Sequence, residues 1–155
     1  MGLLPQTLGR NECIEWIPVD VLSAIILELA LDSSDDATRS RIFHSVNPIR
    51  VRWVHSILPV IKARLERSTG AKIKVVTLST WVEAVKKTAE EEHGSKLIDL
   101  PAFKLLNFYA GLYSTGKGER PEFETHETRA ASKTLRELEP VSTDWVNAWL
   151  DQWGY

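Results

Sequence analysis

The chain has 155 residues, of which 43% are hydrophobic and 26% are charged, and its formal net charge is −2. This length and composition are typical of a single globular domain with a buried core. The weak net charge excludes a global field that would favour nucleic acid or an anionic membrane. We therefore expect one unit over residues 1–155, with neither nucleic acid nor membrane as a partner.

The N-terminal part predicts an arm followed by one helix. Residues 1–13 are predicted to be an irregular arm, and residues 14–19 a short extended segment in which Pro18 limits strand pairing. Asp20 stands where an N-cap belongs, because its carboxylate can accept a bond from a first-turn amide. The helix is predicted to run to about Leu31. Since it is apolar nearly all round, we expect it to be enclosed.

The middle of the chain predicts two strands around one helix. Residues 41–46 are predicted to be a buried strand that Asn47 and Pro48 end. Apolar residues then recur at steps of three and four, which predicts an amphipathic helix. These positions are Val51, Val54, Leu58, Ile61 and Leu65. Pro59 should kink or break this helix, residues 68–70 should end it, and residues 73–76 predict another strand.

Helices dominate the second half of the pattern. Thr80 and Glu83 have the spacing of a capping box for a helix to about Glu92. Pro101 suits the first turn of a helix over residues 102–113, which a glycine-containing loop over residues 114–121 follows. Residues 127–139 predict another helix, with its inward side chains at Ala130, Ala131, Leu135 and Leu138.

The last helix is predicted to begin at Ser142 and to carry three tryptophans at a spacing of four. Trp145, Trp149 and Trp153 therefore share one face, which we expect to dock on the core; the alternative is an aromatic patch that faces a partner. In total the pattern predicts an α/β unit that is predominantly helical, with about six helices and two or three short strands. So few strands cannot form an independent sheet, and we expect them to join a sheet supplied by another segment.

Single residues exclude several kinds of site. Cys13 is the only cysteine, which excludes a disulfide framework and favours a reducing compartment, so we expect a cytoplasmic protein. The histidines lack ligand-like spacing, and we expect no metal site. There is no glycine-rich dinucleotide-binding motif, so we expect no cofactor-binding residue in this chain.

Basic side chains are concentrated in one segment. Residues 50–74 hold seven basic residues and one acidic residue, whereas the rest of the chain holds twelve basic and twenty acidic residues. This asymmetry favours either a surface for an acidic partner or a solvated helix face, and the pattern does not separate the two.

Several motifs, taken in order, resemble a known family. Residues 16–20 read Trp-Ile-Pro-Val-Asp, residues 43–48 read Phe-His-Ser-Val-Asn-Pro, and residues 101–106 read Pro-Ala-Phe-Lys-Leu-Leu. With Trp53 and the closing segment around Trp149, they resemble the C-terminal part of the terminal thioester reductase domain of fungal polyketide and nonribosomal peptide synthetases and adenylate-forming reductases. That domain is an extended short-chain dehydrogenase/reductase.

The resemblance implies a role in releasing a carrier-bound chain. Such domains take an acyl or peptidyl chain from the phosphopantetheine arm of a carrier protein and reduce the thioester with NADPH to an aldehyde or alcohol. The chain would then be the substrate-binding lobe of an extended Rossmann-type reductase whose nucleotide-binding half is absent. Its expected partners are that upstream half and the carrier protein, with NADPH as cofactor of the parent enzyme only.

The resemblance also implies candidate residues. His44, Asn47 and Trp53 are the candidates for substrate binding, although a structural role is the simpler interpretation of His44 and Asn47. The candidates for carrier docking are Arg50, Arg52, Lys62, Arg64 and Arg67. Tyr113 and Lys117 have the family's Tyr-Lys spacing but lie downstream of the family's position, so we assign no catalytic residue.

Two other functions remain open from the sequence. One is a free-standing, non-enzymatic module that binds a carrier or another partner. The other is a piece of a related release domain that closes a ring by Dieckmann condensation instead of reducing. In each case we expect the isolated chain to be inactive as a reductase.

Overall fold

A computed structural model describes residues 2–32, 41–91, 104–114 and 121–155. As predicted, these residues form a mostly helical α/β unit, with seven α-helices and four strands of two or three residues. In chain order the elements are β1 (Leu3–Pro5), a 3₁₀ turn (Gly9–Asn11), β2 (Cys13–Ile14), α1 (Val19–Leu31), β3 (Val51–Arg52), a π-helical turn (Trp53–Ile57), α2 (Leu58–Thr69), β4 (Lys74–Val76), α3 (Leu78–Glu91), α5 (Leu106–Ser114), α6 (His126–Ala131), α7 (Lys133–Arg136) and α8 (Thr143–Gln152).

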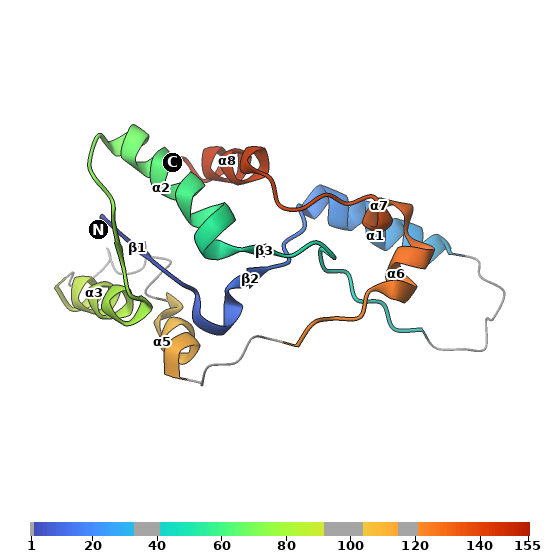
Figure 1. Cartoon of the computed structure of the whole chain (residues 1–155), viewed down its shortest axis with the longest axis horizontal. Helices are drawn as coiled ribbons and strands as arrows, with labels where there is room; N and C mark the ends of the chain where they lie inside the picture. Colours follow the sequence, from blue (N-terminus) through green and yellow to red (C-terminus); the bar gives the residue numbers. More distant parts are fainter. Residues whose placement is uncertain (1, 33–40, 92–103, 115–120) are drawn as a thin grey trace.

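The elements are spread along one long axis (Figure 1), with α1, α6 and α7 at one end, α3 at the other and α8 between them. Three hydrophobic clusters follow this arrangement. The central cluster joins the β2 and π-turn region to α2 and α8, around Ile14, Ile57 and Leu150. Ile25 of α1 packs with Leu135 and Leu138 at one end, while α3 packs on α5 at the other. None of the described helices has the length and apolar character needed to cross a bilayer.

The four strands form two separate pairs. β1 pairs with β4 in parallel, with Leu3 opposite Lys74, and β2 pairs with β3 antiparallel, with Ile14 opposite Val51. The prediction of an irregular arm over residues 1–13 was therefore wrong at residues 3–5 and at residue 13. The partner of β1 lies about seventy residues away in sequence, so no local pattern could reveal this pairing.

Residues 41–46 do not form the predicted strand. No described strand pairs with this segment, and the His44 amide donates instead to the hydroxyl of Thr128 at 3.0 Å. Ile42 is exposed. The segment has the apolar residues that are typical of a strand. However, a strand forms its hydrogen bonds with a neighbouring strand, and the described residues supply none here.

The helix predicted from the apolar steps after Val51 is divided into three elements. Val51 belongs to β3, the π-helical turn follows, and α2 begins at Leu58. Pro59 lies in the first turn of α2, where its missing N–H breaks no helical hydrogen bond, so the predicted break is confirmed. The stop signal is also confirmed, since Gly70 ends α2 with a φ of 66°.

Two predicted helix starts need correction, and one is confirmed. Pro18 rather than Asp20 precedes α1, and Asp20 lies within its first turn without a capping bond. α3 begins at Leu78, where the Thr77 hydroxyl accepts from the amide of Thr80, so the capping box was placed one turn too late. Ser142 caps α8 as predicted, accepting from the Trp145 amide at 3.2 Å.

The helix predicted over residues 127–139 is divided at Ser132. This buried serine ends α6 and caps α7, with its hydroxyl accepting from the Leu135 amide at 3.0 Å. Leu135 and Leu138 point inward as predicted, whereas Ala130 is exposed. The capping preference of serine was the available signal for this break.

The tryptophan face of α8 is confirmed for two of its three members. Trp145 and Trp149 are half-buried against the central cluster, and Trp149 makes an edge contact with Trp16, with ring centroids 5.9 Å apart. Trp153 is exposed, which contradicts the expectation that it docks on the core. The helix predicted over residues 102–113 is seen as α5 from Leu106, and residues 101–103 and 115–120 lie outside the described part of the chain.

Glu28 joins α1 to α7 through its carboxylate. Its oxygens accept from the hydroxyls of Ser132 (2.5 Å) and Thr134 (2.7 Å) and from the Thr134 amide (3.0 Å). These bonds, led by the one from Ser132, hold the pKa of the Glu28 carboxyl below its ordinary value of 4.5. The ionised form is therefore the form that the folded state prefers.

This pairing predicts a pH-dependent loss of stability on replacing Glu28 with glutamine. The pKa of Glu28 is lower in the folded state than in the unfolded state. Its contribution to the stability of the fold is therefore complete above about pH 4.5 and is lost as pH falls through the pKa of the folded state. We expect Glu28→Gln to lower the urea midpoint at pH 7 and to differ less from the unmodified chain at pH 3 than at pH 7. As a control, Glu83→Gln removes an exposed carboxylate of α3 and should leave the midpoint unchanged at both pH values. An equal gap at both pH values would contradict the assignment.

Candidate functional site

His44 lies against the segment that leads into α6. Its Nδ1 is 2.9 Å from the carbonyl oxygen of Glu124, and its ring centroid is 5.1 Å from that of Phe123. Because a carbonyl can only accept, Nδ1 carries the hydrogen in this contact. The arrangement ties residues 41–46 to residues 123–128 and leaves Nε2 as the remaining ring nitrogen for an outside group.

Asn47 is a buried link between distant segments. Its amide nitrogen donates to the carbonyl oxygens of Glu139 (2.9 Å) and Trp16 (3.4 Å), and its side-chain oxygen accepts from the Ile49 amide at 2.9 Å. The Asn47 backbone amide also donates to the carbonyl of Glu15 at 3.0 Å. All of these partners are backbone groups of this chain, so the geometry favours the structural interpretation of Asn47.

Trp53 is also buried and held by the N-terminal arm. Its ring nitrogen donates to the Pro5 carbonyl at 3.0 Å, and its backbone amide donates to the Glu12 carbonyl at 2.9 Å. The Glu12 carboxylate accepts from the next amide, that of Val54, at 3.0 Å. Glu12 therefore fixes the start of the π-helical turn, a role that no sequence pattern indicated.

The three candidates for substrate binding do not converge on one cavity. His44 contacts residues 123–128, Asn47 contacts residues 15–16 and 139, and Trp53 contacts the arm. Their roles toward a substrate stay predictions. Of the three, His44 alone combines partial exposure with a ring nitrogen that has no partner within the described residues.

The basic segment is largely occupied by internal pairs. Arg50 lies 3.0 Å from Glu15 and 3.7 Å from Glu122. Lys62 pairs with Glu66 at 2.8 Å, a contact that is the main reason why the pKa of Glu66 is lowered. Arg64 pairs with the carboxylate of Asp151 and donates from Nε to the Tyr155 carbonyl at 3.0 Å.

Arg52 and Arg67 are exposed. Carrier docking by these five residues stays a prediction.

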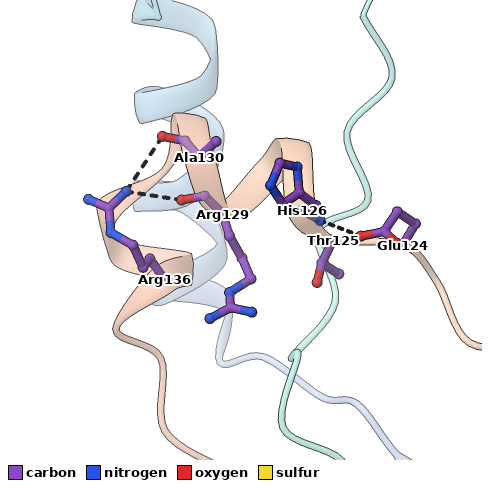
Figure 2. Close-up of a pocket in the computed structure, with 6 residues that line it drawn as sticks. All are labelled: Glu124, Thr125, His126, Arg129, Ala130 and Arg136. Atoms are coloured by element: carbon purple, nitrogen blue, oxygen red, sulfur yellow. Dashed lines mark hydrogen bonds between the residues drawn. The ribbon is translucent and has the colours of Figure 1, made fainter.

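A hollow of about 440 Å³ lies beside α6 and α7. Figure 2 shows its lining, which comprises Glu124, Thr125, His126, Arg129, Ala130 and Arg136. Arg129 belongs to α6 and Arg136 to α7, and both line the hollow. Sequence reasoning missed both arginines, although their spacing of seven residues is typical of side chains that share one helix face.

The described ranges contain no cluster of metal-ligating side chains. Burial raises the pKa of Tyr109, a residue of α5 whose ring centroid lies 5.0 Å from that of Trp81 in α3. Tyr113 lies near the end of α5, and Lys117 lies outside the described residues. The geometry of the described residues thus offers a docking or binding surface and no catalytic constellation.

Comparison with known proteins gives the chain's relationships. It is 29% identical over its whole length to a carboxylic acid reductase of Neurospora crassa, of which it covers 14%. It is 28% identical over 90% of its length to the non-reducing polyketide synthase dbaI of Emericella nidulans, of which it covers 5%. It is 24% identical over 99% of its length to the adenylate-forming reductase Nps11 of Serpula lacrymans, of which it covers 15%. No family model matches the chain.

The chain is related to a segment of these fungal reductases and synthases. This relationship confirms the resemblance inferred from residues 16–20, 43–48 and 101–106. The chain spans only 5–15% of the length of these relatives. It therefore corresponds to a small part of large multidomain proteins. The activity of those whole proteins is not assigned to this chain by the similarity.

Proposed function

We propose that this chain is the substrate- and carrier-facing lobe of an NADPH-dependent thioester reductase, and that it needs the nucleotide-binding half to act. The lobe would close the acyl path and receive the carrier, while the other half would hold NADPH and the catalytic groups. Whether the released chain is reduced to aldehyde or alcohol, or cyclised, depends on that other half. The relationship to carboxylic acid and adenylate-forming reductases supports this assignment.

The observation that carries the proposal is the uncovered apolar face of α1. Val19, Ile26, Leu27 and Leu31 are all exposed, and Leu31 reaches 79%. Their sequence positions, 19, 26, 27 and 31, place these side chains on one face of the helix. Ile25, which is fully buried, lies on the opposite face. This finding corrects the expectation that α1 is enclosed within this chain. A contiguous apolar face of this kind on a helix surface is typical of a docking site.

The segment over residues 41–46, which belongs to no strand of the described chain, is consistent with the same partner. It has the composition of a strand but no strand neighbour in the described part of the chain, and Ile42 is exposed. A sheet edge in the missing half would satisfy its backbone, which is the expectation drawn from the small number of strands.

One observation favours the alternative of a free-standing partner-binding module. β1 pairs with β4 and β2 pairs with β3 without any outside strand, and three hydrophobic clusters are closed within the chain. A chain with these features could fold alone and use the α1 face for a different protein.

Reconstitution tests the proposal directly. The chain would be mixed with the separately expressed nucleotide-binding half from the same gene or from a related reductase, and NADPH oxidation would be followed with a carrier-bound acyl thioester. We expect no oxidation with either part alone and measurable oxidation with both. A well-folded chain that neither binds that half nor restores its activity would support the free-standing module and contradict our proposal.

The docking face can be tested in the same assay. Leu27→Asp places a charge on a side chain that is 62% exposed, so it should fold normally but bind the other half at least tenfold more weakly, because a desolvated carboxylate is costly. Phe108→Asp is the matched control, since Phe108 is 51% exposed on α5, away from α1 along the long axis (Figure 1). Equal losses in both variants would show that the α1 face is not the contact.

A further inference from the structure

The hollow beside α6 and α7 is lined by two arginines that have no carboxylate partner among the described residues. Arg41, Arg50 and Arg64 each pair with a carboxylate. In contrast, Arg129 and Arg136, which both line the hollow, pair with no carboxylate among the described residues. These two residues thus bring two cationic side chains to the lining of the hollow, and Figure 2 shows their guanidinium groups pointing in different directions.

Arg136 is held in place by groups that leave its charge intact. Its Nη1 donates to the carbonyl oxygens of Arg129 at 3.1 Å and Ala130 at 3.5 Å, the last turn of α6 (Figure 2). A guanidinium has five N–H donors, so most of them remain for a ligand. The orientation of the group is fixed before any ligand arrives, which lowers the entropic cost of binding.

The other polar groups of the lining do not cancel this charge. Among the described residues of the lining, Glu124 is the one carboxylate, and its Oε1 accepts from the His126 backbone amide at 2.7 Å. Glu127, next to the lining, lies 3.6 Å from Arg41 and 3.9 Å from His126. The Thr125 hydroxyl adds an uncharged donor. Two arginines and one glutamate leave the described part of the lining with one positive charge in excess.

We propose that this hollow binds the phosphate group of a small phosphate ester. Guanidinium groups match the geometry and charge of phosphate oxygens, and they bind them through several parallel N–H···O bonds. A space of about 440 Å³ lies in the range of small-molecule sites and leaves room for an organic portion beside the phosphate. The phosphate could belong to a free metabolite or to the arm of a carrier protein, and the chemistry of recognition is the same. The inference does not depend on the reductase proposal.

Titration followed by NMR tests this site. The isotope-labelled chain would be titrated at constant ionic strength with inorganic phosphate, with 4′-phosphopantetheine and with acetate. We expect phosphate-bearing probes, but not acetate, to shift the amide signals of residues 124–130 and 136 in the millimolar range or below. Tighter binding of 4′-phosphopantetheine than of inorganic phosphate would identify a carrier arm as the source, and equal binding would identify free phosphate compounds.

Two single variants separate a site from general attraction. Arg129→Gln should weaken binding by about fivefold or more, because it removes a charged donor of the lining without touching the carbonyl contacts of Arg136. Lys133→Gln removes the same charge from an exposed position of α7 outside the lining and should change binding by less than about twofold. Equal losses in both variants, equal shifts with acetate, or no shifts with phosphate would each overturn the proposal.

Discussion

Replacing Gly9 with alanine is expected to be among the most destabilising single substitutions in this chain. Gly9 has a φ of 60°, a conformation that costs other residues about 1–2 kcal/mol. A Cβ at this position would also overlap the carbonyl oxygen of Leu112 in α5. Forcing atoms into a packed contact costs about 1–3 kcal/mol more, so the total is about 2–5 kcal/mol. Since small domains are stable by about 5–15 kcal/mol, this loss should be plain in a urea unfolding curve.

A second glycine supplies the control for this experiment. Gly70 has nearly the same φ, 66°, but nothing lies within 4 Å of its hypothetical Cβ. Gly70→Ala should therefore show the backbone cost alone, about 1–2 kcal/mol. The Gly9 variant should also alter the near-ultraviolet circular dichroism from the Trp81 and Tyr109 pair, because its clash pushes on α5. Equal losses of stability in the two variants would show that the close approach to Leu112 is not tight.

Local signals in the sequence located the features that depend on local physics. Gly70 ends α2, Ser142 caps α8 and Pro59 lies at the start of α2, each because the backbone chemistry of that residue acts within one turn. The strand predicted over residues 73–76 is seen as β4 (Lys74–Val76), although its pairing with β1 is not local. The family resemblance was also visible, because it rested on the order of short motifs rather than on any contact.

The features that were missed depend on contacts between distant residues. The arm contains β1 because residues 74–76 lie beside it, and no pattern within residues 1–13 announces that partner. Residues 41–46 have strand composition but lack a neighbouring strand, so composition alone gave the wrong element. The apolar pattern of α1 did not say whether one face or the whole helix is covered within this chain. That difference, seen at Leu31, is what carries the proposed function.

Replacing Asn47 with alanine is expected to lower the free energy of unfolding by about 2–4 kcal/mol. The side chain is 1% exposed and makes its bonds to the Glu139 carbonyl and the Ile49 amide at 2.9 Å each. Alanine would leave both backbone groups without these partners; each unsatisfied buried group costs about 1–3 kcal/mol, and because these two bonds are only part-buried we expect values in the lower part of that range. The control is Asn147→Ala on α8, which removes a half-buried amide that has no hydrogen bond within the described residues and should change stability by less than about 1 kcal/mol.

Asn47→Asp sharpens the test, because it keeps the shape of the side chain and replaces the amide nitrogen, which donates to the Glu139 and Trp16 carbonyls, with an oxygen. The carboxylate can still accept from the Ile49 amide but would face the Glu139 carbonyl with a second acceptor, so at pH 7 this variant should be at least as unstable as the alanine variant. A protonated carboxyl can donate to that carbonyl, so relative to the unmodified chain the loss should shrink as pH falls. If instead both Asn47 variants unfolded like the unmodified chain and altered only substrate kinetics in the reconstituted enzyme, Asn47 would face the acyl path, and the structural role assigned to it here would be wrong.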